Sequence, residues 1–284
     1  MARTFVSIMV AGLLVACSQP GPRADEQAIS SIDRDRVYVQ TDAHTGVVSY
    51  LHAGTPRVAR IVFVHGASGD ATGWADFLLN VPAGQEYIAP DRPGFGESRP
   101  AGAVVSLRAQ AAALRPLLAP DSDVPVIVVG HARGAAIAAE AALRNPESVS
   151  GLVLVAGAMD PALEDPHWAR PLGRYPPLSW LLPRDLDNGN RERLAHAAGL
   201  RRLAPRLDRI EQPVRIVHGL QDGRAPFANV AFMRARMDAA RVRVTRLENA
   251  GHFLPWTAFA VIQARINTLV AQLCGGLETC DGPR

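Results

Sequence analysis

Short apolar runs rich in β-branched residues recur along this chain of 284 residues, and helical patterns separate them. A strand that is apolar at every position is buried on both faces, which is typical of a parallel sheet covered by helices. Helical patterns over Leu107–Leu118 and Ala135–Arg144 alternate with these runs, and this alternation predicts a parallel, doubly wound sheet. The runs are Ile61–Val64, Tyr87–Ala89, Val126–Val129, Leu152–Val155 and Val214–Val217.

Further elements complete the sheet at both ends. Arg36–Thr41 and Val47–His52 alternate like the strands of an antiparallel hairpin, with Gly46 at the turn. Val242–Leu247 is the expected last strand, and Phe259–Leu273 is the expected closing helix. We therefore predict an α/β fold, with a doubly wound, mostly parallel eight-stranded sheet flanked by helices.

The alternation breaks between residues 159 and 208, where the density of seven prolines excludes one long helix. The segment follows the strand Leu152–Val155 and carries Trp168 and Trp180. We expect it to be an inserted lid that covers the site, excludes water and contributes both tryptophans to the pocket. The alternative is a surface excursion in which the two tryptophans form a small core of their own.

The N-terminus resembles a bacterial lipoprotein signal. Arg3 precedes the apolar run Phe5–Leu14, which is too short to span a bilayer, and Leu14–Cys17 resembles a lipobox. A lipid on Cys17 would anchor the protein to the bacterial cell envelope, and Ser18 favours the outer membrane, facing the periplasm. The alternative is an ordinary secretory signal peptide. The expected units are a signal peptide (1–16), a tether (17–35), a core in two parts (36–158 and 209–273), the lid insertion (159–208) and a tail (274–284).

Without Cys17, two cysteines remain, Cys274 and Cys280. In an oxidising compartment they predict a disulfide that ties down the tail, with two free thiols as the alternative. The sequence has no cysteine and histidine cluster with zinc spacing.

Composition argues against nucleic acid as a partner. The formal net charge is +3, and all thirty basic residues are arginines scattered along the chain. They form no basic stripe interleaved with aromatic residues, which a nucleic-acid surface would need.

The stretch Val126–Ala135 predicts a strand, a sharp turn and a helix, and its centre reads Gly130-His131-Ala132-Arg133-Gly134. A nucleophile elbow has the pattern G-x-S-x-G, with the serine at the position that Ala132 occupies here. Alanine has no oxygen that could attack a carbonyl carbon.

Four motifs together resemble the α/β-hydrolase superfamily, in particular its lid-bearing esterase and lipase-like branch. The resemblance covers roughly residues 36–273, and it implies a hydrolase of the ester or amide class. The motifs are His65–Gly69, Asp91–Ser98, Gly130–Gly134, and Gly219–Asp222 with the later Gly251-His252.

The resemblance implies a catalytic acid and a catalytic histidine. Asp222 follows the strand Val214–Val217, and His252 follows the last strand. The chain order of elbow, acid and histidine is that of the family. A carboxylate beside a histidine fixes the tautomer and stabilises the protonated ring. Asp160 is the alternative acid.

The resemblance also implies an oxyanion hole formed by the backbone N–H groups of Ala67 and Arg133. Asp91–Ser98 resembles a structural turn of the family and has no expected catalytic role. Ser68 is an alternative nucleophile, if its side chain reaches the histidine.

Three interpretations of Ala132 are consistent with these motifs. The alanine could be an introduced replacement of a native serine in a secreted ester or amide hydrolase. It could mark a pseudohydrolase that binds a ligand or partner under the lid. Alternatively, His252 and Asp222 act as a general base without a covalent intermediate. The motifs imply a small, apolar ligand or substrate and no metal or organic cofactor.

Overall fold

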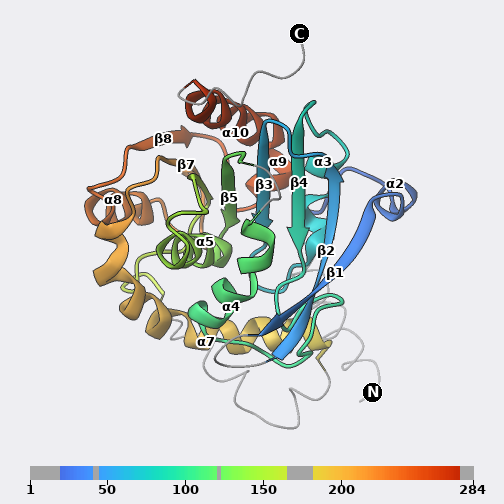
Figure 1. The fold of residues 1–284 in the computed structure, drawn as a ribbon. Coiled ribbons are helices and arrows are strands. Elements are labelled where there is room, and N and C mark those ends of the chain that lie inside the picture. Colours follow the sequence, from blue (N-terminus) through green and yellow to red (C-terminus); the bar gives the residue numbers. More distant parts are fainter. Residues whose placement is uncertain (1–19, 41–44, 120–122, 165–181, 276–284) are drawn as a thin grey trace, which may run out of the picture.

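The computed structural model describes residues 20–40, 45–119, 123–164 and 182–275. Within these residues, eight strands form one sheet in the order β1-β2-β4-β3-β5-β6-β7-β8 (Figure 1). The strands are β1 (Asp33–Gln40), β2 (Thr45–Gly54), β3 (Ala59–Val64), β4 (Gln85–Pro90), β5 (Val126–His131), β6 (Gly151–Val155), β7 (Val214–Gly219) and β8 (Val242–Leu247).

The strand directions confirm the predicted mostly parallel sheet. β1 pairs with β2, and β2 pairs with β4, in antiparallel register, whereas all pairs from β4 to β8 are parallel. The hairpin is also confirmed, but the expected position of Gly46 in its turn is wrong. Gly46 lies inside β2 and pairs with Val39. A Cβ at residue 46 would lie 2.1 Å from the carbonyl oxygen of Arg99, so glycine is needed here for a close backbone approach.

Each central strand contributes alternate side chains to two separate cores, as the pleat of a strand requires. Val62 and Val64 of β3 belong to one core, while Ile61 and Phe63 belong to the other. The β5 strand divides in the same way. Both faces of the sheet are therefore buried, which explains why these strands are apolar at every position.

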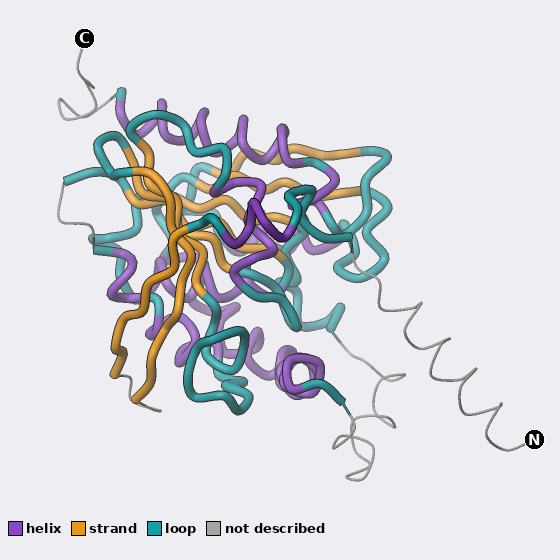
Figure 2. The backbone as a smooth tube through the Cα atoms, turned by 90° about the vertical axis from the view of Figure 1, so that its right-hand side faces the viewer, coloured by secondary structure: helices purple, strands orange, loops and turns teal. Residues whose placement is uncertain are grey.

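Helices cover both faces of the sheet, which lies between them in the side view (Figure 2). The first core packs against α4, α5, α7 and α8, and the second packs against α3, α9 and α10. The α-helices are α2 (Glu26–Ser30), α3 (Ala75–Leu78), α4 (Leu107–Ala113), α5 (Arg133–Arg144), α7 (Arg184–Leu203), α8 (Ala228–Arg236), α9 (Leu254–Thr257) and α10 (Phe259–Cys274). Short 3-10 helices are η1 (Ala71–Trp74), η2 (Arg115–Leu118) and η3 (Ala204–Arg209).

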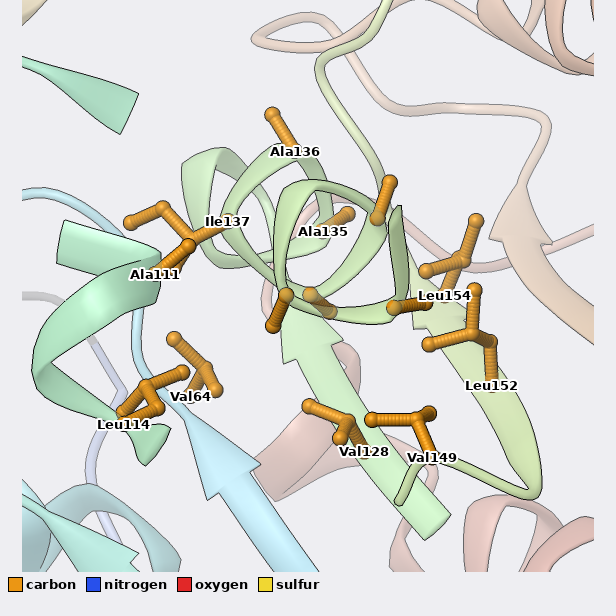
Figure 3. Close-up of a cluster of buried hydrophobic side chains, with 14 of the residues drawn as sticks. Val64, Ala111, Leu114, Val128, Ala135, Ala136, Ile137, Val149, Leu152 and Leu154 are labelled. Carbon is orange, nitrogen blue, oxygen red and sulfur yellow. The ribbon is translucent and has the colours of Figure 1, made fainter. Parts of the chain in front are cut away.

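The helix α5 packs closely on the centre of the sheet because its buried face is made largely of alanine. Ala135 and Ile137 lie against strand residues such as Val64 and Leu154 (Figure 3). Small side chains bring the helix axis near the strands, and α5 follows β5 directly at the predicted elbow. Close packing of α5 therefore fixes the position of the elbow.

Two expected elements differ in length. The predicted helix Leu107–Leu118 is divided into α4 and η2, because Pro116 lacks an N–H and disfavours a continuous helix. The expected tether, which should reach Asp35, is too long. The backbone N–H groups of Arg23 and Ala24 donate hydrogen bonds to the Asp76 carboxylate, and β1 begins at Asp33. The domain therefore begins before Arg23.

The described part of the predicted lid segment contains one long helix, α7, of 20 residues. The expectation that the prolines exclude a long helix here is therefore wrong, because α7 occupies the proline-free stretch between Pro183 and Pro205. Four predicted residues lie outside the described ranges, so their roles stay predictions: Cys17, Trp168, Trp180 and Cys280. In the described ranges, no helix combines the length and the apolar character needed to cross a bilayer.

A buried ion cluster anchors α7 to the core. Glu192 accepts two hydrogen bonds from Arg92, at 2.7 and 2.9 Å, and its carboxylate lies 3.3 Å from Arg133 Nε. Gln110 Nε2 donates to the same carboxylate. Glu192 and Arg92 are fully buried. Because an unpaired buried charge is costly, this cluster fixes α7 in one position over α5.

We expect Glu192→Gln to lower the free energy of unfolding by about 3–5 kcal/mol, because it leaves two buried guanidinium groups without their carboxylate. Urea denaturation measures this change. Glu248→Gln is the matched control, because Glu248 is exposed and its pairing with Arg246 is 3.5 Å long. It should change the same free energy by less than about 1 kcal/mol. Equal effects of the two substitutions would contradict the anchoring role.

Candidate functional site

The elbow lies between the end of β5 and the start of α5, and Ala132 occupies its apex. Ala132 has φ 52° and ψ −117°, a backbone conformation that costs a residue other than glycine about 1–3 kcal/mol. Two glycines make the turn possible. A Cβ at residue 130 would lie 2.3 Å from the carbonyl oxygen of Gly134, and one at residue 134 would lie 2.2 Å from that of Val64.

Hydrogen bonds hold this strained backbone in place. The N–H of Ala132 donates to Val155 O at 3.0 Å, and Ala132 O accepts from Ala135 and Ala158. The Ala132 side chain is a methyl group at the floor of a pocket, where a nucleophile elbow presents its attacking oxygen. The elbow geometry is therefore complete, but the residue at its apex is apolar.

The structure brings Asp222 and His252 together, as the sequence order predicts. His252 Nδ1 lies 2.9 Å from one carboxylate oxygen of Asp222 and 3.1 Å from the other. Backbone N–H groups of Arg224 and Ala225 also donate to Asp222 Oδ1. Burial acts to raise the pKa of Asp222, but the hydrogen bonds and the nearby His252 outweigh it, so the pKa is lowered. An ionised Asp222 holds the proton of neutral His252 on Nδ1 and leaves Nε2 as an acceptor.

His131 supports the position of His252, a contact that the sequence analysis missed. His131 Nε2 donates a hydrogen bond to the carbonyl oxygen of His252 at 2.9 Å, and the two ring centres lie 4.9 Å apart. Burial, with a contribution from the His252 charge, lowers the pKa of His131 to about 3. His131 is therefore neutral at physiological pH and acts as a fixed donor. Its place in the elbow motif was visible, but not its partner 121 residues away.

The expected oxyanion donors lie at the same pocket. Ala67 and Arg133 both line it. In the described ranges, neither backbone N–H has a hydrogen-bond acceptor within the protein. The loop before Ala67 is fixed by Arg92, whose N–H donates to His65 Nε2 and whose guanidinium donates to Gly66 O. Both amides are thus held in place and unsatisfied.

Ser68, the alternative nucleophile, and Asp160, the alternative acid, make no hydrogen bond to His252 among the described residues. Ser68, at φ 60°, packs against α7, because a Cβ at residue 189 would lie 1.9 Å from its Oγ. Ser68 lines the pocket, but it makes no hydrogen bond to His252. Asp160 accepts a hydrogen bond from the Ala162 N–H, and it is Asp222 that contacts the histidine.

Hydrogen bonds tie the Asp91–Ser98 turn to neighbouring segments, and the expectation that it has no catalytic role stays a prediction. Asp91 accepts hydrogen bonds from the Ala71 N–H, the Glu97 N–H and the Arg34 side chain. Ser98 Oγ donates to the carbonyl oxygen of Asp91.

The pocket has a volume of about 580 Å³, which is in the range of small-molecule sites. Aromatic and apolar side chains share its wall with charged ones. In the ranges that the structure describes, no three histidine, cysteine or carboxylate side chains are grouped as a metal site would require. The lining residues beyond the elbow and dyad include Asp70, Trp74, Leu163, Glu164, Arg193, His196, Arg224, Phe253 and Trp256.

A second buried histidine, His196 of α7, is held neutral by its neighbours. Arg133 Nη1 donates to His196 Nδ1 at 2.7 Å, so the ring proton lies on Nε2, which is 3.1 Å from Ala158 O. Burial and the Arg133 charge lower the pKa of His196 to about 3. The unfolded chain, with a histidine pKa near 6.5, binds the proton more readily than the folded one.

We therefore expect His131 and His196 to lower stability as the pH falls from 7 to 5, since both histidines take up protons there in the unfolded state and stay neutral in the folded state. Each histidine that stays neutral in the folded state lowers the free energy of unfolding by about 2 kcal/mol over this pH range. His196→Gln keeps one acceptor and one donor, so it should reduce the loss by about that amount. Urea denaturation at pH 7 and pH 5 measures both proteins. An unchanged pH dependence in the variant would show that His196 is protonated in the folded state.

Comparison with known proteins agrees with this fold. Residues 61–264 match the α/β-hydrolase family. The chain is 37% identical to Lipase LipV of Mycobacterium tuberculosis over 39% of this chain and 40% of that protein, less than half of its length. It is 28% identical to a pimeloyl-[acyl-carrier protein] methyl ester esterase of Aromatoleum aromaticum, over 68% of this chain and 90% of the esterase. The crystal structure of a putative lipase from Acinetobacter baumannii has the same fold, with a TM-score of 0.64 and 20% identity over 89% of this chain and 96% of that one. The chain belongs to the α/β-hydrolase family.

Proposed function

We propose that the chain binds a small molecule with an ester- or amide-type carbonyl, and that His252 activates water against it without a covalent intermediate. One observation carries this proposal. The Asp222–His252 pair is hydrogen-bonded at a pocket whose elbow residue is a methyl group. His252 Nε2 has no hydrogen-bond partner among the described residues, so it is available to accept a proton from water or ligand.

The chemistry needs only groups that this chain supplies, together with one water molecule. His252 Nε2 takes a proton from water while the water oxygen bonds to the carbonyl carbon. The carbonyl oxygen becomes an oxyanion, and the N–H groups of Ala67 and Arg133 stabilise it. His252 then returns the proton to the leaving oxygen or nitrogen as its bond to carbon breaks. Asp222 stabilises the protonated ring between the two steps.

Ala132 limits the rate of such a reaction. A serine triad without its nucleophile retains only about 10³–10⁴-fold catalysis over water, from the oxyanion hole and binding. The proposal therefore predicts slow turnover, far below that of an efficient esterase. The esterase and lipase relatives support the carbonyl class of ligand, and the alanine argues against an acyl-enzyme.

A second candidate is ligand binding without turnover, and the methyl group of Ala132 is the observation that favours it. In this case the pocket and the dyad persist as a binding site. The two candidates differ in whether His252 contributes to product formation, so a direct test separates them.

We expect no labelling of the protein by a serine-directed fluorophosphonate, because the elbow presents no hydroxyl group. Ala132→Ser should introduce labelling, since the proposed site then has a hydroxyl group beside the Asp222–His252 pair and the two proposed oxyanion donors. Mass spectrometry of labelled peptides locates the modified residue. The control is Ala132→Ser combined with His252→Gln, which should remove the label. Labelling of the unmodified protein at Ser68 or any other serine would overturn the nucleophile-free site.

We expect slow hydrolysis of p-nitrophenyl acetate with no initial burst, measured as p-nitrophenol release over time. His252→Gln should lower this rate markedly, because the proton acceptor is lost, and leave only the acceleration that the oxyanion donors and binding supply. His52→Gln is the matched control, since His52 also lies beside a carboxylate, that of Asp35 at 3.2 Å, but outside the pocket. Equal rates in the unmodified protein and His252→Gln would reject the general base and leave the binding candidate.

A further inference from the structure

Two arginines at the pocket lack partners that their charge would ordinarily attract. Arg193 of α7 is half-buried, and Arg224, in the loop after β7, is exposed. Both line the pocket that contains His252. In the described ranges, neither guanidinium forms an ion pair or donates a hydrogen bond. Two such groups at one cavity create a site of strong positive potential.

The nearby carboxylates do not neutralise this charge. Glu192 is already shared between Arg92 and Arg133. Among the described residues, Glu164 is the remaining acidic neighbour of Arg193, and burial raises its pKa to about 7 although Arg133 and Arg193 oppose the shift. Glu164 is therefore only partly ionised at neutral pH. Counting only the described side chains, the positive charge of the two arginines exceeds the negative charge of Glu164.

The two arginines are also close enough to influence each other. Burial lowers the pKa of Arg193, and the charge of Arg224 lowers it further. Repulsion between like charges in a partly buried site is relieved when an anion lies between them. Asp70 is another carboxylate that lines the pocket. It accepts hydrogen bonds from the Thr72 N–H and hydroxyl group and caps the 3-10 helix η1, so its oxygens are engaged away from the two arginines.

Arg224 is held in position by an aromatic ring. Its guanidinium carbon lies 5.1 Å from the ring centre of Phe253, a cation–π arrangement. Phe253 follows His252 directly, so the ring places the guanidinium close to the dyad. A guanidinium presents paired N–H donors that match the two oxygens of a carboxylate.

We propose that Arg193 and Arg224 form a subsite for a carboxylate, so that the ligand of this pocket is a monoanion with its carbonyl group near His252. A single carboxylate balances the charge that Glu164 leaves uncompensated. This inference rests on the proposed function in taking the pocket as the ligand site, but it does not depend on turnover.

Isothermal titration calorimetry of the full chain tests the subsite with two ligands of the same length, monomethyl adipate and dimethyl adipate. We expect the monoanion to bind at least about tenfold more tightly than the neutral diester, since a charge-assisted hydrogen bond contributes that much. Arg193→Gln should weaken binding of the monoanion by roughly ten- to a hundredfold and leave the diester unchanged. Arg224→Gln should act in the same direction, and its exposed position makes misfolding a poor explanation of any effect.

Arg201→Gln is the matched control, because Arg201 is an exposed arginine of the same helix outside the pocket. It should leave both affinities unchanged. Equal affinity for monoanion and diester, or no binding of either, would overturn the subsite. An equal loss of affinity for both ligands in the Arg193→Gln variant would also overturn the subsite. Hexyl phosphate is a third ligand, and tighter binding of it than of monomethyl adipate would reject the carboxylate in favour of a phosphate group.

The result is separable from the test of turnover. If the Ala132→Ser variant hydrolyses p-nitrophenyl acetate but binds monomethyl adipate no more tightly than dimethyl adipate, only the subsite is rejected. If the unmodified protein binds the monoanion more tightly than the diester but His252→Gln does not change the hydrolysis rate, only the general base is rejected.

Discussion

The site depends on one close backbone contact, the packing of the β5–α5 turn against the end of β3. Gly134 lies so near the carbonyl oxygen of Val64 that no side chain fits between them, and Gly130 lies as near to Gly134. This contact forces Ala132 into its positive-φ conformation, at a cost of about 1–3 kcal/mol. Hydrogen bonds to Val155 and from Ala158, together with the alanine-rich face of α5, stabilise the turn against that strain.

None of these contacts uses the side chain at position 132. The turn is determined by the glycines, the packed helix and the strand order, and the oxyanion donors are backbone groups. The dyad comes from two other loops, after β7 and β8, and His131 links it to the elbow through a carbonyl oxygen. A site built in this way keeps its geometry whether the apex residue is serine or alanine. Intact geometry is therefore compatible with the absence of the attacking oxygen.

The sequence was sufficient to predict the elements whose signal is local. Apolar runs identified the buried strands, because both faces of the sheet are covered, and chain order identified Asp222 and His252. Contacts between distant segments were not predictable. The Arg92–Glu192–Arg133 cluster joins residues up to 100 positions apart, and nothing local distinguishes Glu192 from a solvent-exposed charge on α7. The packing of Arg23 and Ala24 on Asp76 was hidden for the same reason, within a segment whose composition resembles a linker.

The ion cluster also contributes to the electrostatics of the site. Arg133 has two roles in the proposed function, because its backbone N–H is one of the two proposed oxyanion donors while its side chain lies within the buried cluster. Glu192 shares its charge between two guanidinium groups, so a net positive charge remains beside the elbow in a region shielded from water. Such a charge stabilises negative charge on a bound carbonyl oxygen more strongly than it would in water. In the proposed subsite, the same field favours an anionic ligand at Arg193 and Arg224. In the proposed function, binding of an anion and stabilisation of an oxyanion thus have one electrostatic origin, the excess of arginine over carboxylate where Arg92, Arg133, Arg193 and Arg224 converge around Glu192.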